Sequence, residues 1–215
     1  MYYDTLASLQ LALDSGKVRE IDVPQIVGEY MLAASPRYEI SCTMTNLNVN
    51  IDFVFGFFDS EKGSELQKKF DEALAALRAN GKLDELLKTY TGNFDAQKLQ
   101  SAELENFDGA ETLKIAVTGD MPPIDFVAAD GKPAGFNVAI LSEIAKILKV
   151  NLEFINVDTG AKTVALTSGR ADVVFWDKKV NVSHVLQYDI PANVLISSPY
   201  YSFNTFVHVR LKDAK

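Results

Sequence analysis

Hydrophobic positions in the first half of the chain follow helical spacing in some stretches and form a strand-like run in another. Leu6, Leu9 and Leu13 fall on one helical face, and residues 26–32 repeat this spacing. Residues 51–58 are almost continuously apolar, which is typical of a strand buried on both faces. We therefore predict two short helices followed by a buried strand.

A longer helix is predicted after this strand. Ser64 and Gln67 have the spacing of a capping box, in which each side chain bonds the other residue's backbone N–H. Apolar positions then recur every three or four residues up to Leu77, and Gly81 is placed to end the helix. A further short helix is expected over residues 83–90.

Strand and helix patterns alternate in the second half of the chain. The expected strands cover residues 113–117, 152–157 and 172–176, and the expected helices cover 136–148 and 161–168. Alternation of this kind predicts an α/β fold with a parallel sheet and helices on both of its faces.

Three further segments complete the pattern. Residues 93–111 are polar and acidic, and we interpret them as a connector. Residues 181–196 read as a loop-like insertion, and residues 200–210 as a final β-rich strand long enough to cross between two lobes.

Composition excludes several classes of function. The formal net charge of −8 argues against nucleic-acid binding, which needs concentrated Lys and Arg. No apolar run approaches the roughly 18 residues that span a bilayer, and the N-terminus has no basic region of a signal peptide. Cys42 is the single cysteine and His184 and His208 are the two histidines, so we expect no metal site and no cofactor.

Five short motifs follow one another in the second half of the chain. They are Pro122-Pro123-Ile124, Asp130-Gly131, Gly135-Phe136-Asn137, Ser168-Gly169 and Ser198-Pro199-Tyr200-Tyr201. Their order resembles the opening of type II periplasmic solute-binding proteins of the amino-acid type, family 3. Proteins of that family deliver small polar solutes to ABC importers.

In that family the opening lies at the N-terminus of the mature protein, whereas here it begins halfway along the chain. The first half resembles the family's last third, through Ser15-Gly16 and residues 29–32, 51–58 and 64–81. The resemblance therefore implies a permuted segment order. The family's middle βαβ segment has no counterpart here, which implies a reduced second lobe.

The implied fold is periplasmic-binding-protein-like type II, a doubly wound, mostly parallel sheet with one complete and one reduced lobe. Residues 1–50 are assigned to the reduced lobe and residues 51–92 to a C-terminal-type segment that packs on the complete lobe. Residues 93–111 are the connector, and residues 112–215 form the complete lobe and end in the crossing strand.

Ligands of doubly wound sheets bind beyond the carboxyl ends of the strands. The loops after Val117, Val157 and Phe175 are expected at that edge, and free backbone N–H groups are expected where a helix follows Gly135. A hydroxyl, two carboxylates, an ammonium and aromatic faces are available there. The predicted ligand-binding residues are Thr118, Asp120, Met121, Trp176, Asp177, Lys179 and Tyr200.

Each of these residues also has a purely structural interpretation. Trp176 could cap the core at a strand end, and Asp177 could be a solvated surface charge. Asp120 could cap the turn before Pro122, and one of Tyr200 and Tyr201 would be core if the two alternate across a strand.

The sequence departs from the amino-acid binders at the ligand positions. By resemblance, those proteins hold the ligand carboxylate with a Ser or Thr and an Arg, and the amine with an Asp of the second lobe. Lys179 falls near the hydroxyl position, and the Arg has no equivalent in residues 181–188. Pro24 stands near the position of the Asp, and Asp22 would share its face only if this stretch is a strand. These departures argue against binding of a classical α-amino acid.

The leading functional hypothesis is non-enzymatic binding of a small polar solute, for an ABC importer or as a sensor domain. The alternatives are a degenerate lobe that serves as a protein-interaction module and, less favoured, a dehydratase-like enzyme. Asp120 and Asp177 are the carboxylate pair that the sequence brings to one edge for such an enzyme.

The resemblance also implies partners and a location. An ABC permease is the expected partner, and the free edge of strand 200–210 could support a homodimer. The expected location is extracytoplasmic, with a lipid anchor in the full-length precursor and a signal segment that this chain lacks.

Overall fold

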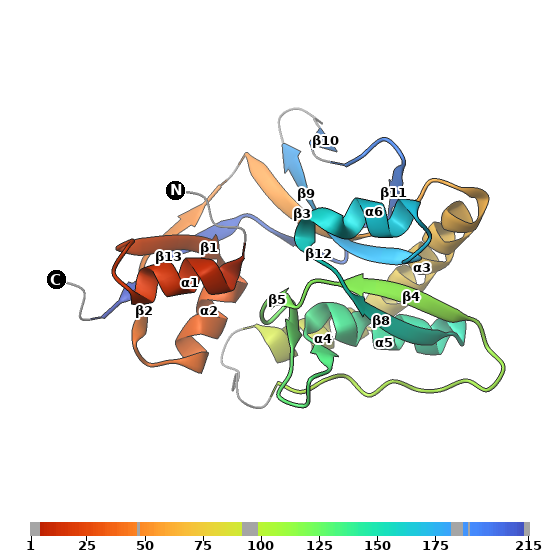
Figure 1. The fold of residues 1–215 in the computed structure, drawn as a ribbon, viewed down its shortest axis with the longest axis horizontal. Coiled ribbons are helices and arrows are strands. Elements are labelled where there is room, and N and C mark those ends of the chain that lie inside the picture. Colours follow the sequence, from red (N-terminus) through yellow and green to blue (C-terminus); the bar gives the residue numbers. More distant parts are fainter. Residues whose placement is uncertain (1–4, 47, 92–98, 182–186, 189, 213–215) are drawn as a thin grey trace.

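The computed structural model describes residues 5–46, 48–91, 99–181, 187–188 and 190–212. The chain forms two lobes that lie side by side (Figure 1). The large lobe is built around a seven-stranded sheet, and the small lobe around a three-stranded sheet. The lobe sizes agree with the predicted type II architecture of one complete and one reduced lobe.

Five strands form the continuous path of the large sheet, in the order β11-β3-β9-β4-β8. They are β11 (Val194–Ile196), β3 (Val49–Phe58), β9 (Val173–Asn181), β4 (Thr112–Val117) and β8 (Asn151–Asn156). Strand β4 pairs in parallel with both β8 and β9, whereas β3 runs antiparallel to β9 and β11. The sheet is therefore mixed: β4, β8, β9 and β11 run in one direction, and β3 runs against them.

Two short strands lie off this path. Strand β10 (Gln187–Tyr188) pairs with the end of β9, and β12 (Tyr201–Phe203) pairs with the start of β3. The prediction of residues 181–196 as a loop-like insertion is wrong in part, because β11 adds to the edge of β3 and buries Val194. Short, isolated strands leave too weak a period in the sequence to be recognised.

Helices cover both faces of the large sheet. Helices α3 (Glu61–Ala79), α4 (Lys82–Tyr90) and α5 (Phe136–Leu148) pack on one face, where the aromatic side chains of β3 are buried. The 3₁₀ turn η2 (Thr159–Ala161) and α6 (Lys162–Thr167) lie on the other face (Figure 1). Because both faces are covered, β3 is apolar along most of its length, as predicted.

The predicted start of α3 is wrong by a few residues. Ser60, not Ser64, is the N-cap, and its side chain accepts a hydrogen bond from the backbone N–H of Gly63. Gly81 follows α3 in the left-handed conformation, with φ +77°, as expected of a glycine that ends a helix.

The small lobe consists of an antiparallel sheet in the order β1-β13-β2, with two helices. Its elements are α1 (Leu6–Asp14), β1 (Glu20–Pro24), α2 (Gln25–Ala34), β2 (Tyr38–Thr45) and β13 (Thr205–Leu211). The central strand β13 therefore comes from the other end of the chain. Helix α2 contacts all three strands, and its buried side chains join those of β1 and β13 in the core.

The chain passes between the lobes at two adjacent places. Strand β2 leads into β3, and β12 leads into β13 across Asn204. The backbone N–H of Asn46 donates to the carbonyl of Asn204 at 2.8 Å, so the two crossings are joined. The predicted crossing strand is thus observed as two strands, one in each sheet.

A separate three-stranded ribbon follows β4. It comprises β5 (Asp120–Met121), β6 (Asp125–Val127) and β7 (Pro133–Ala134). Within the described residues, no helix combines the length and apolar character needed to cross a membrane.

Candidate functional site

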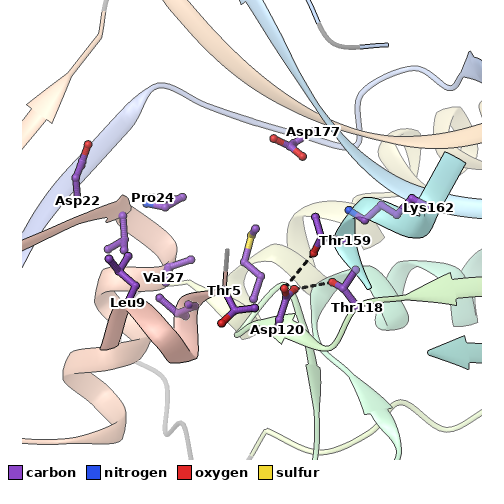
Figure 2. A pocket seen from close by; sticks show the side chains of 13 residues that line it. Thr5, Leu9, Asp22, Pro24, Val27, Thr118, Asp120, Thr159, Lys162 and Asp177 are labelled. Carbon is purple, nitrogen blue, oxygen red and sulfur yellow. Dashed lines mark hydrogen bonds between the residues drawn. The ribbon is translucent and has the colours of Figure 1, made fainter. Parts of the chain in front are cut away.

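A cavity of about 240 Å³ lies where the two lobes meet (Figure 2). The small lobe contributes Thr5, Leu6, Leu9, Asp22, Val23, Pro24 and Val27 to its lining. The large lobe contributes Thr118, Asp120, Met121, Thr159, Lys162 and Asp177. The large-lobe wall includes the turns that follow β4 and β8, at the carboxyl ends of two parallel strands. This is where a doubly wound sheet is expected to bind ligands.

Three residues of the large-lobe wall form a hydrogen-bonded group. Thr118 Oγ1 donates to Asp120 Oδ1 at 2.6 Å, and Thr159 Oγ1 donates to Asp120 Oδ2 at 3.2 Å. Figure 2 shows both bonds, which join the turn after β4 to the turn after β8. Gly119 permits the first turn because its φ is +69°, a conformation that favours glycine. The Asp120 carboxylate is thereby held at the cavity surface by two hydroxyls.

A buried carboxylate lies directly behind this group. Asp125 is 4% exposed, and its Oδ2 accepts a hydrogen bond from the backbone N–H of Thr118 at 3.0 Å. The Thr118 hydroxyl also lies 3.1 Å from this oxygen, so its single hydrogen is shared between Asp120 and Asp125. Its Oδ1 has no hydrogen-bond partner among the described residues. Burial raises the pKa of Asp125, and Thr118, the backbone N–H of Gly119 and the charge of Lys162 offset this shift in part.

The small-lobe wall is formed by the outward face of β1 and by the two helices. Residues in β1 alternate, with Ile21 and Val23 buried and Asp22 exposed. Asp22 and Pro24 therefore share a face, which lines the cavity. The sequence predicted that Asp22 shares a face with Pro24 only if this stretch is a strand, and it is.

The cavity opens beside a wider groove of about 590 Å³ along the large lobe. Thr5, Thr118, Asp120 and Thr159 line both spaces, and the groove adds residues 157–160. It thereby brings the carboxylate of Asp158 near the site.

Four of the predicted ligand-binding residues come together in the cavity. The four that line it are Thr118, Asp120, Met121 and Asp177. The sequence analysis had placed them in two separate loops, one after Val117 and one after Phe175. Asp177 does not lie in a loop as predicted, because β9 continues to Asn181 and pairs with β3 along most of that length. It projects from a strand that extends past its parallel neighbours.

Trp176 is also in β9 rather than in a loop. Its side chain is half-buried and packs with Val174 and Val194 in the cluster that includes α6. It also lines a small cavity of about 30 Å³ together with Asp125, Lys162 and Asp177. Lys179 belongs to β9, but its side chain lies outside the described part of the structure.

Tyr200 lies in the core of the large lobe. It is 4% exposed, it stacks on Phe55 at a ring-centroid distance of 4.6 Å, and its hydroxyl donates to Asn137 Oδ1 at 2.8 Å. Burial raises the pKa of Tyr200 well above its ordinary value. Tyr200 lines neither the two cavities nor the groove, which agrees with the structural interpretation of this residue.

The expectation of free backbone N–H groups at the start of α5 is wrong. The N–H of Phe136 donates to the carbonyl of Pro123, and the N–H of Asn137 donates to that of Ile124, each at 3.0 Å. Gly135 permits this approach because a Cβ there would overlap the Ile124 carbonyl. His184, assigned to the surface by the sequence, lies outside the described residues.

Nine lining residues were absent from the predicted set, namely Thr5, Leu6, Leu9, Asp22, Val23, Pro24, Val27, Thr159 and Lys162. The turn after Val157 was expected at this edge, so Thr159 could have been chosen from its position. The small-lobe residues could not, because no local pattern shows which face of α1 or α2 meets the other lobe.

The second half of the chain is similar to a known protein family. Residues 113–215 match the family model of bacterial extracellular solute-binding proteins, family 3. The match begins within β4, the strand that the sequence interpretation takes as the family's opening strand. No curated protein sequence matches the chain.

Solved structures are similar in fold at low sequence identity. The periplasmic binding protein AgaA of A. tumefaciens R10, in complex with agropinic acid, is 12% identical, with a TM-score of 0.51. The alignment covers 98% of this chain and 54% of AgaA. YhfZ from Shigella flexneri is 8% identical over 99% of this chain and 65% of its own, with a TM-score of 0.44. This chain thus spans less than two thirds of either protein, and it has the periplasmic-binding-protein-like type II fold.

Proposed function

We propose that this chain binds a small polar solute, without chemical turnover, in the cavity between its two lobes. The observation that carries the proposal is the cavity itself. It lies at the carboxyl ends of β4 and β8 and is lined by carboxylates, hydroxyls and an ammonium over an apolar floor. A few polar groups in a mostly apolar concave surface are typical of small-molecule sites. The match of residues 113–215 to a solute-binding family supports the same conclusion.

Lobe closure would trap the solute. The two lobes are joined by the adjacent crossings near Asn46 and Asn204, and a rotation about this pair would bring β1 toward the turn after β4. Hinges of this kind are a few residues at the ends of elements that absorb the change in backbone angles. In the closed state, Asp22 and Pro24 would contact a solute held by Thr118 and Asp120.

The biological role follows from the same likeness. The proteins of the matched family are extracellular and bind solutes, and we propose that this chain acts outside the cytoplasm, anchored by lipid in its precursor. It would deliver the solute to an ABC permease or present it as the input of a sensor. Strand β13 has no free edge, because it pairs with both β1 and β2, so a homodimer would form through the reduced lobe and its edge strand β2.

A thermal-shift screen tests binding directly. The purified chain is heated with amino acids, short peptides, amines, organic acids and sugars. A ligand that binds only the folded state stabilises it by about 2.7 kcal/mol at a hundredfold excess over its Kd. We expect at least one class to raise the Tm, and a flat screen across all classes would contradict the proposal.

A matched pair of substitutions locates the site without assuming the ligand's chemistry. Thr159→Trp places an indole at the cavity wall, where it should weaken binding at least tenfold. Thr167→Trp places the same side chain at the exposed end of α6, away from the cavity, and should leave binding unchanged. Equal affinity in both variants would move the site elsewhere on the molecule.

A further inference from the structure

More carboxylates than ammonium groups line the cavity. Among the described lining residues, Asp22, Asp120 and Asp177 stand against a single basic residue, Lys162. We propose that the solute is a small aliphatic diamine, whose two ammonium groups are held by Asp22 on one lobe and Asp177 on the other. This inference rests on the proposed solute-binding function and names the class of solute.

Asp22 and Asp177 lie on opposite walls of the cavity, as Figure 2 shows. Neither side chain forms a hydrogen bond or an ion pair with another described residue. Asp120 differs, because it already accepts bonds from Thr118 and Thr159. Two carboxylates on different lobes, without a partner among the described residues, can each bind one end of a dication, and the ligand would then hold the lobes together.

Lys162 lines both the main cavity and the small cavity that contains Asp125. Its charge is the smallest of the influences on the pKa of that carboxyl group. Lys162 therefore sets one positive charge against the three carboxylates of the cavity wall. The carboxylates of Asp22 and Asp177 are left to be balanced by a ligand or by solvent.

The buried oxygen of Asp125 is an independent indication of a cationic ligand. Its carboxyl group is almost fully buried, and its Oδ1 is without a hydrogen-bond partner among the described residues. A buried, unsatisfied polar atom is costly and calls for a functional explanation. A cation in the adjoining cavity would stabilise this carboxylate through the short space that Thr118, Met121 and Asp177 also line.

The size and apolar lining of the cavity fit a short methylene chain. Its volume of about 240 Å³ is below the roughly 300–1,000 Å³ that is usual for drug-sized ligands. Leu9, Val27 and Met121 supply apolar surface between the two carboxylates. An α-amino acid would also bring a carboxylate into this acidic space, where like charges repel.

Isothermal titration calorimetry with three four-carbon compounds tests the inference on the unmodified chain. They are 1,4-diaminobutane, 1-aminobutane and butane-1,4-diol, which carry two, one and no positive charges. We expect the diamine to bind about tenfold or more tightly than the monoamine, and the diol to give no signal. Equal affinities for the diamine and the monoamine would overturn the two-carboxylate arrangement.

Isosteric substitutions then test whether Asp22 and Asp177 each bind one ammonium group of the diamine. Asp22→Asn and Asp177→Asn should each weaken diamine binding about tenfold, because each removes one charge-assisted contact. Asp108→Asn removes an equal charge from an exposed turn outside the cavity and should leave the affinity unchanged. If all three variants weaken binding equally, the attraction is due to the net charge of −8 and the inference is wrong.

The failure of this inference is distinguishable from that of the proposed function. Binding of a neutral or anionic solute that Thr159→Trp weakens, with no response to the diamine, would overturn the diamine and retain the solute-binding site. No response to any compound class would overturn both.

Discussion

The two lobes bury their sheets in different ways. The large sheet is covered on both faces, by α3, α4 and α5 on one and by α6 on the other. The small sheet is covered by α1 and α2, while the end of its edge strand β2, from Ser41 to Thr45, is exposed. Two-sided burial supports a large core, whereas one-sided burial leaves the small lobe with less apolar contact per residue.

The difference extends to how each lobe is assembled along the chain. Residues after Val49 supply all strands of the large sheet, but the small sheet takes its central strand β13 from residues near the C-terminus. Strand β13 continues from β12, which pairs with β3 of the large sheet. We therefore expect the small lobe to depend on the large lobe for its folding more than the large lobe depends on the small one.

The largest expected effect comes from the core of the large lobe. Phe55 is fully buried against Phe70, Phe175 and Tyr200. Phe55→Ala should lower the free energy of unfolding by about 3–5 kcal/mol, because it leaves a cavity that the neighbours cannot fill. Urea denaturation monitored by circular dichroism measures this loss.

Hydrogen exchange on Phe55→Ala tests the dependence between the lobes. Amides of β1 and β2 should lose protection together with those of β3, since β13 is held in place through β12. Retained protection of the small sheet would mean that it folds by itself and does not depend on the large lobe.

A smaller effect is expected at the contact between α2 and β13. A Cβ at Gly28 would overlap the side chain of Val207, a β-branched residue that is stiff at χ1. Gly28→Ala should cost about 1–2 kcal/mol, because overpacking outweighs the higher helix propensity of alanine. Exchange should increase in the small lobe while the large sheet stays protected.

The double variant Gly28→Ala with Val207→Ala provides the control. Removing the valine methyls makes room for the new Cβ, so the combined cost should be smaller than the sum of the two single costs. Additive costs would show that the overlap is relieved in some other way and that the helix can shift.

The smallest change in the free energy of unfolding is expected at Asp125, where a substitution should stabilise the chain instead of destabilising it. Burial raises its pKa, so folding favours the protonated carboxyl. Its contribution to stability is present below the ordinary pKa of an aspartate and is lost as the pH rises through the raised value. Asp125→Asn keeps an oxygen for Thr118 and removes the buried charge, so it should stabilise the chain by about 1 kcal/mol at pH 7.

This gain should shrink as the pH falls from the raised pKa of Asp125 toward about 4, because below that value the wild-type carboxyl is protonated in both the folded and the unfolded state. Urea titrations at pH 7 and at pH 3.5 check the sign. A variant that is destabilised at pH 7 would show that the charge of Asp125 is needed for folding. Under the diamine inference, the stabilised variant should also bind 1,4-diaminobutane more weakly.

Much of the fold could be predicted from the sequence because its signals are local. The apolar run that forms β3, the helical spacing of Leu66, Phe70 and Leu74, and Gly81 at a helix end were all correctly interpreted. The early start of α3 was missed, since Ser60 and Ser64 are both acceptable N-caps and only packing chooses between them.

The candidate site could be predicted only on one wall. Thr118, Asp120 and Met121 directly follow a strand, and the rule that ligands bind at the carboxyl ends of parallel strands identifies them from their position in the sequence. Trp176 and Asp177 were chosen for their chemistry and assigned to a loop. Their strand geometry depends on β3, which pairs with them from more than a hundred residues away.

The sequence by itself determined the longer helices and strands and the polar turn that follows β4 at the sheet edge, since these depend on periodicity and on nearby residues. The tertiary structure alone decided that Asp22 and Asp177 line one cavity and that Tyr200 belongs to the core. The opposing walls of the cavity come from residues 5–27 and 118–177, and their meeting is set by how β13 pairs with β1 and β2. Long-range pairing of this kind leaves no local pattern, because its free energy comes from contacts that form only when the chain has folded.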